Sequence, residues 1–324
     1  MALTLVTGGS GYVGALVVQA LQASGRRVRV LDVLLHGQEE VAAEQRSTGV
    51  EVHVGDVRDR EARRAALDGV DEVVHLAAIV GDPACAHDPA ISHAVNVEAT
   101  RSLVEDVRTA GTRRMVFAST CSNYGRMEDP TIPIDEEAVL APVSLYAEQK
   151  VQMEQMIMGS SQNGLATTCL RFATIYGAAP RMRFDLTVNE FTRDLWSDRL
   201  LEVYGEQFWR PYVHVRDAAR AVVGVLDAPP DLIRGEVFNV GRSSENYRKL
   251  DLVDEIRKQT ASGSVSYVAR DEDPRDYKVS FEKIHAVLGF KTRTSVPGGI
   301  AEILAALDED AFGDPYDGRF RNIA

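Results

Sequence analysis

A tyrosine and a lysine four residues apart are the side chains best suited to chemistry in this chain of 324 residues. Tyr146 and Lys150 lie in the segment LYAEQKVQMEQ, where helical spacing turns both side chains the same way. A free phenol has a pKa near ~10, too high for a base at neutral pH, but an ammonium group one turn away lowers it. The pair therefore suits removal of a proton from a hydroxyl group, although the same spacing is common on solvated helix faces.

A second polar cluster follows the apolar run MVFA, in the segment FASTCSNYG (117–125). A strand that ends in Thr120, Cys121 and Ser122 is either a polar turn or the edge of an active site. A thiol of lowered pKa can move protons, so Cys121 is a candidate catalytic residue, although a free cysteine more often packs as a small apolar residue. Two histidines are weaker candidates, because His75 lies in an apolar strand and His87 lies on a loop that either covers a ligand or faces solvent.

Three glycines stand between a strand and a helix in the segment LTLVTGGSGYVGALVVQAL. Gly8 permits a tight turn, Gly11 lets the backbone approach a pyrophosphate, and Gly14 lets helix and strand pack closely. The start of the helix then offers free N–H groups to the phosphates. Because strand and helix flank the glycines, the segment predicts a dinucleotide site rather than an ordinary turn.

Two carboxylates complete this predicted dinucleotide site. Asp32 ends the second strand, 18 residues after Gly14, where it can accept hydrogen bonds from both ribose hydroxyls. The same carboxylate would repel a 2′-phosphate, so the sequence favours NAD over NADP. Asp56 follows the third strand, where it can reach the adenine amino group, cap the following helix, or do both.

These residues lie at the junctions of alternating strands and helices. We expect strands at 3–7, 27–32, 50–56, 72–78, 114–119 and 166–172, then short strands at 212–215 and 236–241. We expect helices at 12–24, 58–68, 93–110, 146–162, 216–226, 250–260, 280–288 and 299–307, and the segment 177–196 should be loop-rich and then helical. Alternation of this kind predicts a doubly wound α/β fold, a parallel (Rossmann) sheet whose ligands lie beyond the carboxyl ends of its strands. We predict a Rossmann domain of 1–175 and 211–241 and a smaller, discontinuous C-terminal substrate lobe of 176–210 and 242–324.

Composition excludes several classes of protein. The formal net charge of −12 argues against a nucleic-acid or anionic-membrane partner, although local arginines can still hold a small anion. No apolar run is long enough to span a bilayer. The three cysteines, Cys85, Cys121 and Cys169, form no CxxC pair, so we expect no disulfide framework, no metal site and a cytoplasmic location.

The motifs share their order and spacing with a known family. TGGSGYVG, Asp56, HLAA (75–78), Asn96, FASTCSNYG, YAEQK and RPYVHVRDAARA together resemble the extended short-chain dehydrogenase/reductase superfamily. More narrowly, the chain resembles the NAD-dependent nucleotide-sugar epimerase/dehydratase family over essentially its whole length. The resemblance implies NAD as cofactor, a nucleotide-diphosphate sugar as substrate and Tyr146 as base, with Lys150 also holding the nicotinamide ribose and Thr120 bonding the reacting hydroxyl. The residues implied at NAD are Gly8, Gly11, Tyr12, Val13, Gly14, Asp32, Asp56, Val57, Leu76, Ala77, Ala78, Asn96, Tyr146, Lys150 and Phe172.

The resemblance also implies a set of substrate-binding residues. These are Thr120, Cys121, Ser122, Thr174, Asn189, Arg210 and Arg275. Arginine suits a diphosphate because its guanidinium group forms paired hydrogen bonds, although Arg275 could instead form a surface ion pair. The chain departs from many relatives at Thr174, where they have Asn. Two further arginines, Arg181 and Arg183, either reach the substrate or pair with Asp185 and Glu190.

The two positions after Thr120 carry no carboxylate, which helps to predict the reaction that the oxidised sugar undergoes. The resemblance implies that every member first oxidises a sugar hydroxyl, usually at C4. Dehydratases of the family have an Asp–Glu pair after the Thr and decarboxylases have a Glu at the second place, whereas this chain has Cys121 and Ser122. A 4-epimerase needs neither carboxylate, so we predict C4 epimerisation with tightly bound NAD. The alternatives are a dehydratase or C3/C5 epimerase that uses Cys121, a 4-keto-sugar reductase, and an NAD-sensing module, which would be expected to lose Tyr146 or Lys150.

A homodimer is the remaining expectation. The helices at 93–110 and 146–162 are those that pair as a four-helix bundle in dimers of the family. Met153, Met156 and Ile157 fall at a spacing that suits either an apolar docking face or packing within the subunit.

Overall fold

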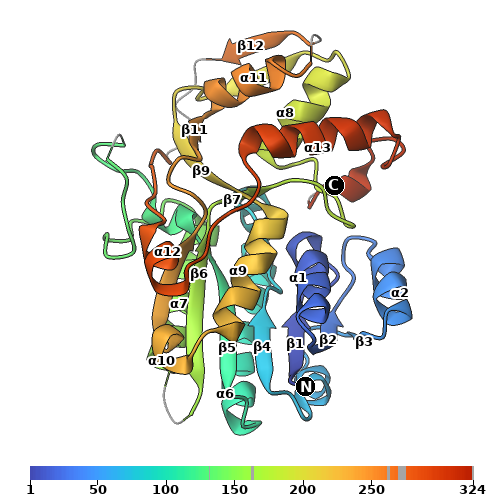
Figure 1. The fold of residues 1–324 in the computed structure, drawn as a ribbon. Helices are drawn as coiled ribbons and strands as arrows, with labels where there is room; N and C mark the ends of the chain where they lie inside the picture. Colours follow the sequence, from blue (N-terminus) through green and yellow to red (C-terminus); the bar gives the residue numbers. More distant parts are fainter. Residues whose placement is uncertain (131, 162–163, 261–262, 269–274, 323–324) are drawn as a thin grey trace.

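A seven-stranded parallel sheet, in the order β10-β6-β5-β4-β1-β2-β3, forms the centre of the computed structural model (Figure 1). The structure describes residues 1–130, 132–161, 164–260, 263–268 and 275–322. The strands of this sheet are β1 (Leu3–Thr7), β2 (Arg27–Asp32), β3 (Glu51–Val54), β4 (Glu72–His75), β5 (Arg114–Thr120), β6 (Ala166–Phe172) and β10 (Glu236–Val240). The chain runs from β1 outward to β3, then returns to β4 on the other side of β1. Beyond the carboxyl ends of β1 and β4 the strand order therefore reverses, which is where doubly wound folds bind ligands.

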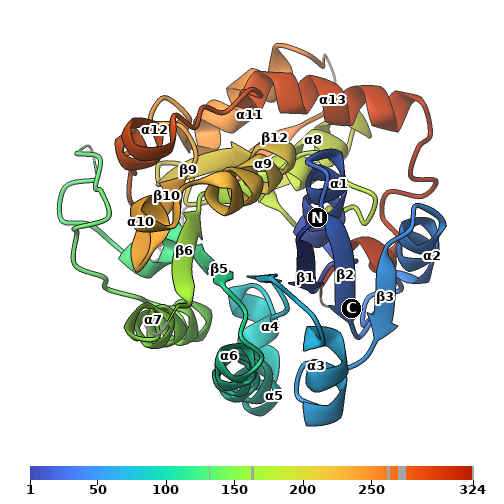
Figure 2. The ribbon, with the colours of Figure 1, turned by 60° about the horizontal axis from the view of Figure 1, so that its bottom comes forward.

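Alternate residues of the strands belong to two separate cores. Val6 and Val74 pack in the first core, whereas Leu5 and Val73 pack in the second. Helices α1 (Tyr12–Ala23) and α9 (Val215–Asp227) cover the first face, and α3 (Arg60–Leu67), α6 (Thr100–Thr109) and α7 (Leu145–Gly159) cover the second (Figure 2). Burial on both faces explains why the strands read as near-continuous apolar runs.

Shorter elements connect the strands on the Rossmann side of the molecule. They are α2 (Glu39–Ser47), α4 (Asp82–His87), α5 (Pro89–His93), the π-helix η1 (Ala94–Ala99), the 3₁₀-helix η2 (Cys121–Tyr124) and α10 (Pro230–Ile233). The helix expected at 93–110 is therefore a π-helical segment followed by α6. A π-helix is rare and frequently marks a functional position.

The smaller C-terminal part contains two further sheets and a third core. Its strands are β7 (Thr174–Tyr176), β9 (Trp209–His214) and β11 (Asn246–Arg248) in one sheet, and β8 (Leu201–Tyr204) and β12 (Val265–Val268) in the other. Its helices are α8 (Thr187–Trp196), α11 (Lys249–Arg257), α12 (Glu282–Leu288), α13 (Val296–Asp308) and the 3₁₀-helix η3 (Gly318–Phe320). In Figure 1 the two small sheets with α8, α11 and α13 lie beyond the carboxyl ends of the parallel strands, whereas α12 lies beside the large sheet and packs against β10.

The structure confirms the predicted Rossmann fold, with differences in detail. The strands expected at 50–56 and 72–78 are shorter, because their last residues belong to loops around the cavity described below. Strand β10 joins the large sheet, whereas β9 pairs with β7 and β11, so the predicted domain division stays a prediction. The sequence did not predict α2, α4, α5, α10, β7, β8, β11, β12 or the 3₁₀-helices η2 and η3.

Apolar residues of α7 pack inside the subunit. Met153 and Ile157 are fully buried in the second core, so the idea that they form an exposed docking face is wrong, while Met156 packs against the same core. The homodimer stays a prediction. Over the described parts of the chain, we find no helix with the length and apolarity needed to cross a bilayer.

Candidate active site

A cavity of about 370 Å³ opens where the strand order reverses. Eleven of the residues expected at NAD line it: Gly8, Gly11, Tyr12, Val13, Gly14, Asp32, Asp56, Val57, Leu76, Ala77 and Ala78. They come from the ends of β1, β2, β3 and β4 and the start of α1, so one site gathers four loops. Six further polar residues line the cavity: His36, Gln38, Arg58, Arg181, Arg183 and Asn322. Four of them were not predicted from the sequence, and the roles of Arg181 and Arg183 were left open.

The glycines of the first loop form a close-packed cradle at this cavity. Gly8 has a φ of +72°, and a Cβ atom there would lie 2.8 Å from the backbone nitrogen of Ala77. A Cβ at Gly14 would lie 2.0 Å from the carbonyl oxygen of Gly8. Gly11 is the N-cap of α1 and forms no side-chain cap, so no side chain of the cap residue covers the first N–H groups of the helix. Side chains are excluded from the place where a pyrophosphate would approach, so the loop fits a dinucleotide.

The two predicted carboxylates have different surroundings. Asp32 is 7% exposed and accepts hydrogen bonds from the backbone nitrogens of Ser10 and Leu34, both at 2.9 Å. Burial raises the pKa of this carboxyl, and the backbone hydrogen bonds oppose that rise. Asp56 pairs with Arg58 at 2.6 Å, which lowers the pKa of Asp56. The alternative role of Asp56 as a helix cap is wrong, because Asp59 caps α3 by accepting from the backbone nitrogen of Glu61.

Asn96 and Phe172 lie behind the cavity rather than on its wall. The Asn96 side chain accepts a hydrogen bond from the nitrogen of Ile79 at 2.8 Å and donates to the carbonyl of Ile79 at 3.0 Å. It also donates to Gln149 of α7 at 2.8 Å, so the π-helix fixes both a cavity-lining loop and the helix of Tyr146. Phe172 is 6% exposed in the first core, opposite Thr120 in the β5–β6 register. Their direct contact with NAD stays a prediction.

Lys150 is anchored to the end of β5. Its Nζ atom donates a hydrogen bond to the carbonyl of Ala118 at 2.8 Å and lies 4.6 Å from the centre of the Phe117 ring. The same Nζ atom is 5.8 Å from the centre of the Tyr146 ring. Burial lowers the pKa of Lys150 to about 8. The helix geometry expected from the YxxxK spacing is therefore present.

Tyr146 is held in its neutral form by its surroundings. Burial raises the pKa of the phenol, and Cys85 and Asp82 act in the same direction, while Arg183 opposes them. Added positive charge would lower this pKa, as an oxidised nicotinamide ring would do. Thr120 ends β5 one residue beyond Ser119, and its hydroxyl accepts from the nitrogen of Ser122 at 3.1 Å. Thr120 and Ser122 are half-buried.

Cys121 does not face the site. It is fully buried in the first core, and its thiol donates to the carbonyl of Arg171 at 3.2 Å. Burial raises the pKa of the thiol far above neutral. The prediction of Cys121 as a catalytic or substrate-binding residue is therefore not supported, and its packing role is favoured. His75 is likewise buried, between the hydroxyls of Thr7 and Thr100, whereas His87 is exposed.

The predicted substrate-binding residues form two groups. Asn189 is fully buried and accepts from the nitrogen of Gly177 at 2.9 Å, so it orders the loop after β7. Arg210, which is 5% exposed, donates to the carbonyl oxygens of Trp209 and Arg275. Arg275 pairs with Asp82 at 2.9 Å, across from the C-terminal part to the start of α4. Thr174 is half-buried on β7.

Asp82 links Arg275 to the helix of Tyr146. It accepts a hydrogen bond from the hydroxyl of Ser144, at 2.5 Å, and Ser144 caps α7 by accepting from Ala147. The ion pair that the sequence left open for Arg275 thus exists, but with Asp82 as partner. The only sequence signal for Asp82 was its loop, GDPACAHDPA, directly after β4.

Arg181 and Arg183 line the cavity together with Asn322 of the C-terminal segment. Arg183 pairs with Asp185 at 2.8 Å, one of the two roles left open for it. Arg181 donates to the side chain of Asn322 at 2.8 Å and to the carbonyl of Arg321 at 3.0 Å. Burial, together with Arg183, lowers the pKa of Arg181 to about 10. Two cationic side chains therefore border a cavity that would hold an anionic cofactor.

A glycine cradle at a strand-order reversal, with a buried carboxylate at the end of β2, defines a dinucleotide-binding Rossmann protein. A model of the NAD dependent epimerase/dehydratase family matches residues 4–241. The chain belongs to this family, and its cofactor is NAD. Among the described residues, no group of His, Cys, Asp or Glu side chains could hold a metal ion.

Individual relatives agree with this assignment. The UDP-glucose 4-epimerase of Lacticaseibacillus casei is 29% identical over 88% of this chain and 90% of its own. The crystal structure of the Thermus thermophilus UDP-glucose 4-epimerase in complex with NAD is 26% identical, with a TM-score of 0.83 over 94% of this chain and 99% of its own. The structure of MoeE5 in complex with UDP-glucuronic acid and NAD is 28% identical, with a TM-score of 0.81 over 95% and 99%.

Proposed function

We propose that the protein is a nucleotide-sugar epimerase that inverts C4 of the sugar through a transient 4-keto intermediate. The observation that carries the proposal is the Tyr146–Lys150 pair at the end of β5, where Thr120 is followed by no carboxylate. Cys121, the one residue that could have replaced a carboxylate, is turned into the core. Dehydration and C3/C5 epimerisation need a group that moves a carbon-bound proton, and this position does not supply one.

Each side chain has one task in this mechanism. Tyr146 removes the proton of the C4 hydroxyl and later returns it to the ketone oxygen. Thr120 holds that oxygen by a hydrogen bond, and the Lys150 ammonium stabilises the phenolate while its bond to Ala118 fixes its position. Bound NAD⁺ supplies the hydride acceptor and donor. Inversion requires that the ketone present its other face before the proton returns.

The glycine cradle, Asp32 and Asp56 would hold NAD, and two arginines would hold the substrate. Arg210 and Arg275 adjoin one another, and a diphosphate suits their guanidinium groups. Two relatives described above are UDP-glucose 4-epimerases and a third was solved with UDP-glucuronic acid, so we propose a UDP-sugar as substrate.

A panel of UDP-, dTDP- and GDP-sugars, followed by proton NMR, tests the proposal. We expect a UDP-sugar to give a mixture with its C4 epimer without added NADH, and Tyr146→Phe to slow this conversion by about 10²–10⁴-fold while still folded. Loss of water from the sugar would indicate a dehydratase. Consumption of added NADH with each turnover would indicate a reductase, and either result would contradict the proposal.

A further inference from the structure

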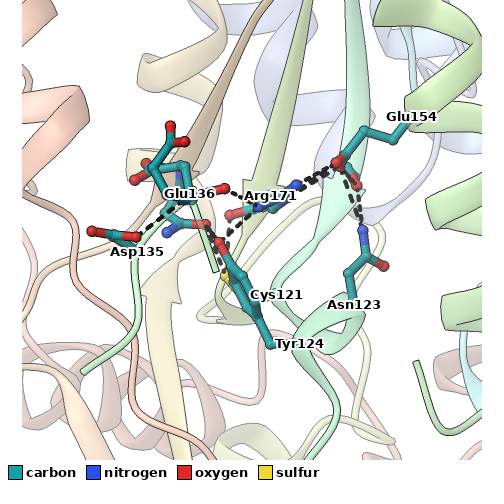
Figure 3. Close-up of polar contacts among 10 residues, drawn as sticks. Cys121, Asn123, Tyr124, Asp135, Glu136, Glu154 and Arg171 are labelled. Carbon is teal, nitrogen blue, oxygen red and sulfur yellow. Dashed lines mark hydrogen bonds and ion pairs between the residues drawn. The ribbon is translucent and has the colours of Figure 1, made fainter. Parts of the chain in front are cut away.

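Helix α7 carries a third polar residue on the face of Tyr146 and Lys150. Glu154 lies one turn beyond Lys150 and is 3% exposed. Its carboxylate accepts from the hydroxyl of Ser119 at 2.6 Å and from the guanidinium of Arg171 at 2.5 Å. Figure 3 shows Glu154 pointing toward Arg171 and Asn123 from the helix.

The partners of Glu154 directly precede two residues that the site uses. Ser119 precedes Thr120 on β5, and Arg171 precedes Phe172 on β6. Lys150 bonds to Ala118, the residue before Ser119. Two successive turns of α7 are thus hydrogen-bonded to two successive residues of β5. These two bonds fix the position of the helix along the strand and its rotation about its own axis.

Arg171 extends this contact to the far side of the sheet. Its guanidinium donates to the hydroxyl of Tyr124 at 2.9 Å, which donates to the side chain of Asn239 at 2.8 Å (Figure 3 shows Arg171 and Tyr124). The backbone nitrogen of Asn239 in turn donates a hydrogen bond to the Glu136 carboxylate at 2.7 Å. The network therefore connects α7, β5, η2, β6 and β10, all with buried side chains except Glu136.

A buried ion pair of this kind is poor evidence for stability. Removing two charges from water costs as much as their attraction returns, and apolar replacements are often neutral or stabilising. What the pair does provide is one defined arrangement of the groups that it joins. That arrangement is the one in which Tyr146 and Lys150 stand at the end of β5.

We propose that Glu154 is a positioning residue, which holds the Tyr146–Lys150 helix in its reactive place through Ser119 and Arg171. The proposal rests on the proposed function, in which Tyr146 is the base. Its role goes beyond stability, because the residues that it bonds are the immediate neighbours of Thr120 and of the Lys150 anchor.

Glu154→Gln tests this role, with Glu72→Gln as the matched control. Glutamine keeps the shape of the side chain and an oxygen for Ser119 but loses the charge that pairs with Arg171. Glu72 is also buried, at 6% exposed, and it pairs with Arg26 at 2.8 Å and accepts from the hydroxyl of Thr4. It lies at the amino end of β4, away from α7. Both variants therefore lose one buried charge, but only one variant loosens the helix.

Two measurements on the NAD-bound enzyme separate positioning from stability. We expect Glu154→Gln to lower kcat by about ten- to a hundredfold, with KM changed less than about threefold, because misplacement of a base affects the reacting geometry. Titration of the Tyr146 signal in spectra of ¹³Cζ-labelled tyrosine, assigned with Tyr146→Phe, gives the second measurement. We expect a pKa higher by about half a unit or more, because the ammonium of Lys150 is less well fixed. Loss of the Glu154 charge alone would instead lower this pKa.

The outcomes are distinct. If Glu154→Gln matches Glu72→Gln in kcat, or lowers the Tyr146 pKa, the positioning role is wrong. If the wild-type enzyme epimerises no sugar, the proposed function fails, while the tyrosine titration, which needs no substrate, still decides the positioning role. If Glu154→Gln does not fold, Ser119→Ala replaces it, because this variant keeps the ion pair and removes the hydroxyl that donates to Glu154 and accepts from the side chain of Asn123. We expect the same two changes in smaller size, and their absence would overturn the proposal.

Discussion

Gly14→Ala should damage both the fold and the NAD site. The added Cβ would lie 2.0 Å from the oxygen of Gly8 and 2.8 Å from the Cα of Gly9, whereas ordinary contact begins at 3.4 Å. Both neighbours are backbone, so α1 must move away from the loop by roughly an ångström. Overpacking of this kind costs about 1–3 kcal/mol or more, against a gain of about 1 kcal/mol in helix propensity. We expect a net loss of about 2 kcal/mol in the free energy of unfolding and at least a tenfold loss of NAD affinity.

Gly224→Ala is the matched control for this prediction. Gly224 lies inside α9, and a Cβ there meets no atom within 4 Å. We expect it to gain about 0.5–1 kcal/mol in stability, with unchanged NAD affinity. Urea denaturation of the cofactor-free proteins and calorimetric titration with NAD⁺ measure both quantities. If Gly14→Ala is as stable as the wild type and binds NAD equally well, the account of the cradle is refuted.

Three further predictions concern single side chains. Cys121→Ala should lose about 1–2 kcal/mol of stability in urea denaturation and keep kcat within twofold; a hundredfold fall would restore a catalytic thiol. Arg275→Ala should raise KM for the nucleotide sugar about tenfold, and Asp82→Asn should lower KM because the competing carboxylate is gone; unchanged steady-state values for both would exclude the diphosphate role. Burial lowers the pKa of Lys150 from 10.5 to about 8, so the unfolded chain binds more protons between these pH values and stability rises with pH there. In the cofactor-free wild type, the free energy of unfolding should rise by up to about 3 kcal/mol between pH 8 and 10.5, and Lys150→Met should remove this rise. Urea denaturation across this pH range measures it, and an equal pH slope in both proteins would contradict the prediction.

The cofactor site was largely predictable because its determinants are local in sequence. The glycine loop, Asp32 and the strand ends each occupy a few consecutive residues, and the parallel topology brings these segments to one edge of the sheet. Helical spacing likewise predicted that Tyr146 and Lys150 share a face. These features need no knowledge of which distant segments meet.

Contacts between segments that are distant in the chain could not be predicted from the sequence. Asn322 reaches Arg181 from the far end of the chain, and Arg275 meets Asp82, and no local pattern marks either pair. The direction of Cys121 had no such local signal, because Cys121 begins the 3₁₀-helix η2 and does not continue the alternation of β5. Met153 and Ile157 were misassigned because apolar spacing does not distinguish a core face from a docking face.

Transfer of a C4-deuterium label is the decisive test of C4 epimerisation by this enzyme. A UDP-sugar deuterated at C4 is incubated with the enzyme in ordinary water, and the unlabelled sugar is incubated in deuterated water. We predict that the label stays at C4 in both epimers and that no solvent deuterium enters C3 or C5. We also predict that Tyr146→Phe slows conversion by about 10²–10⁴-fold. Loss of the C4 label, solvent deuterium at C3 or C5, or full activity of Tyr146→Phe would contradict these predictions.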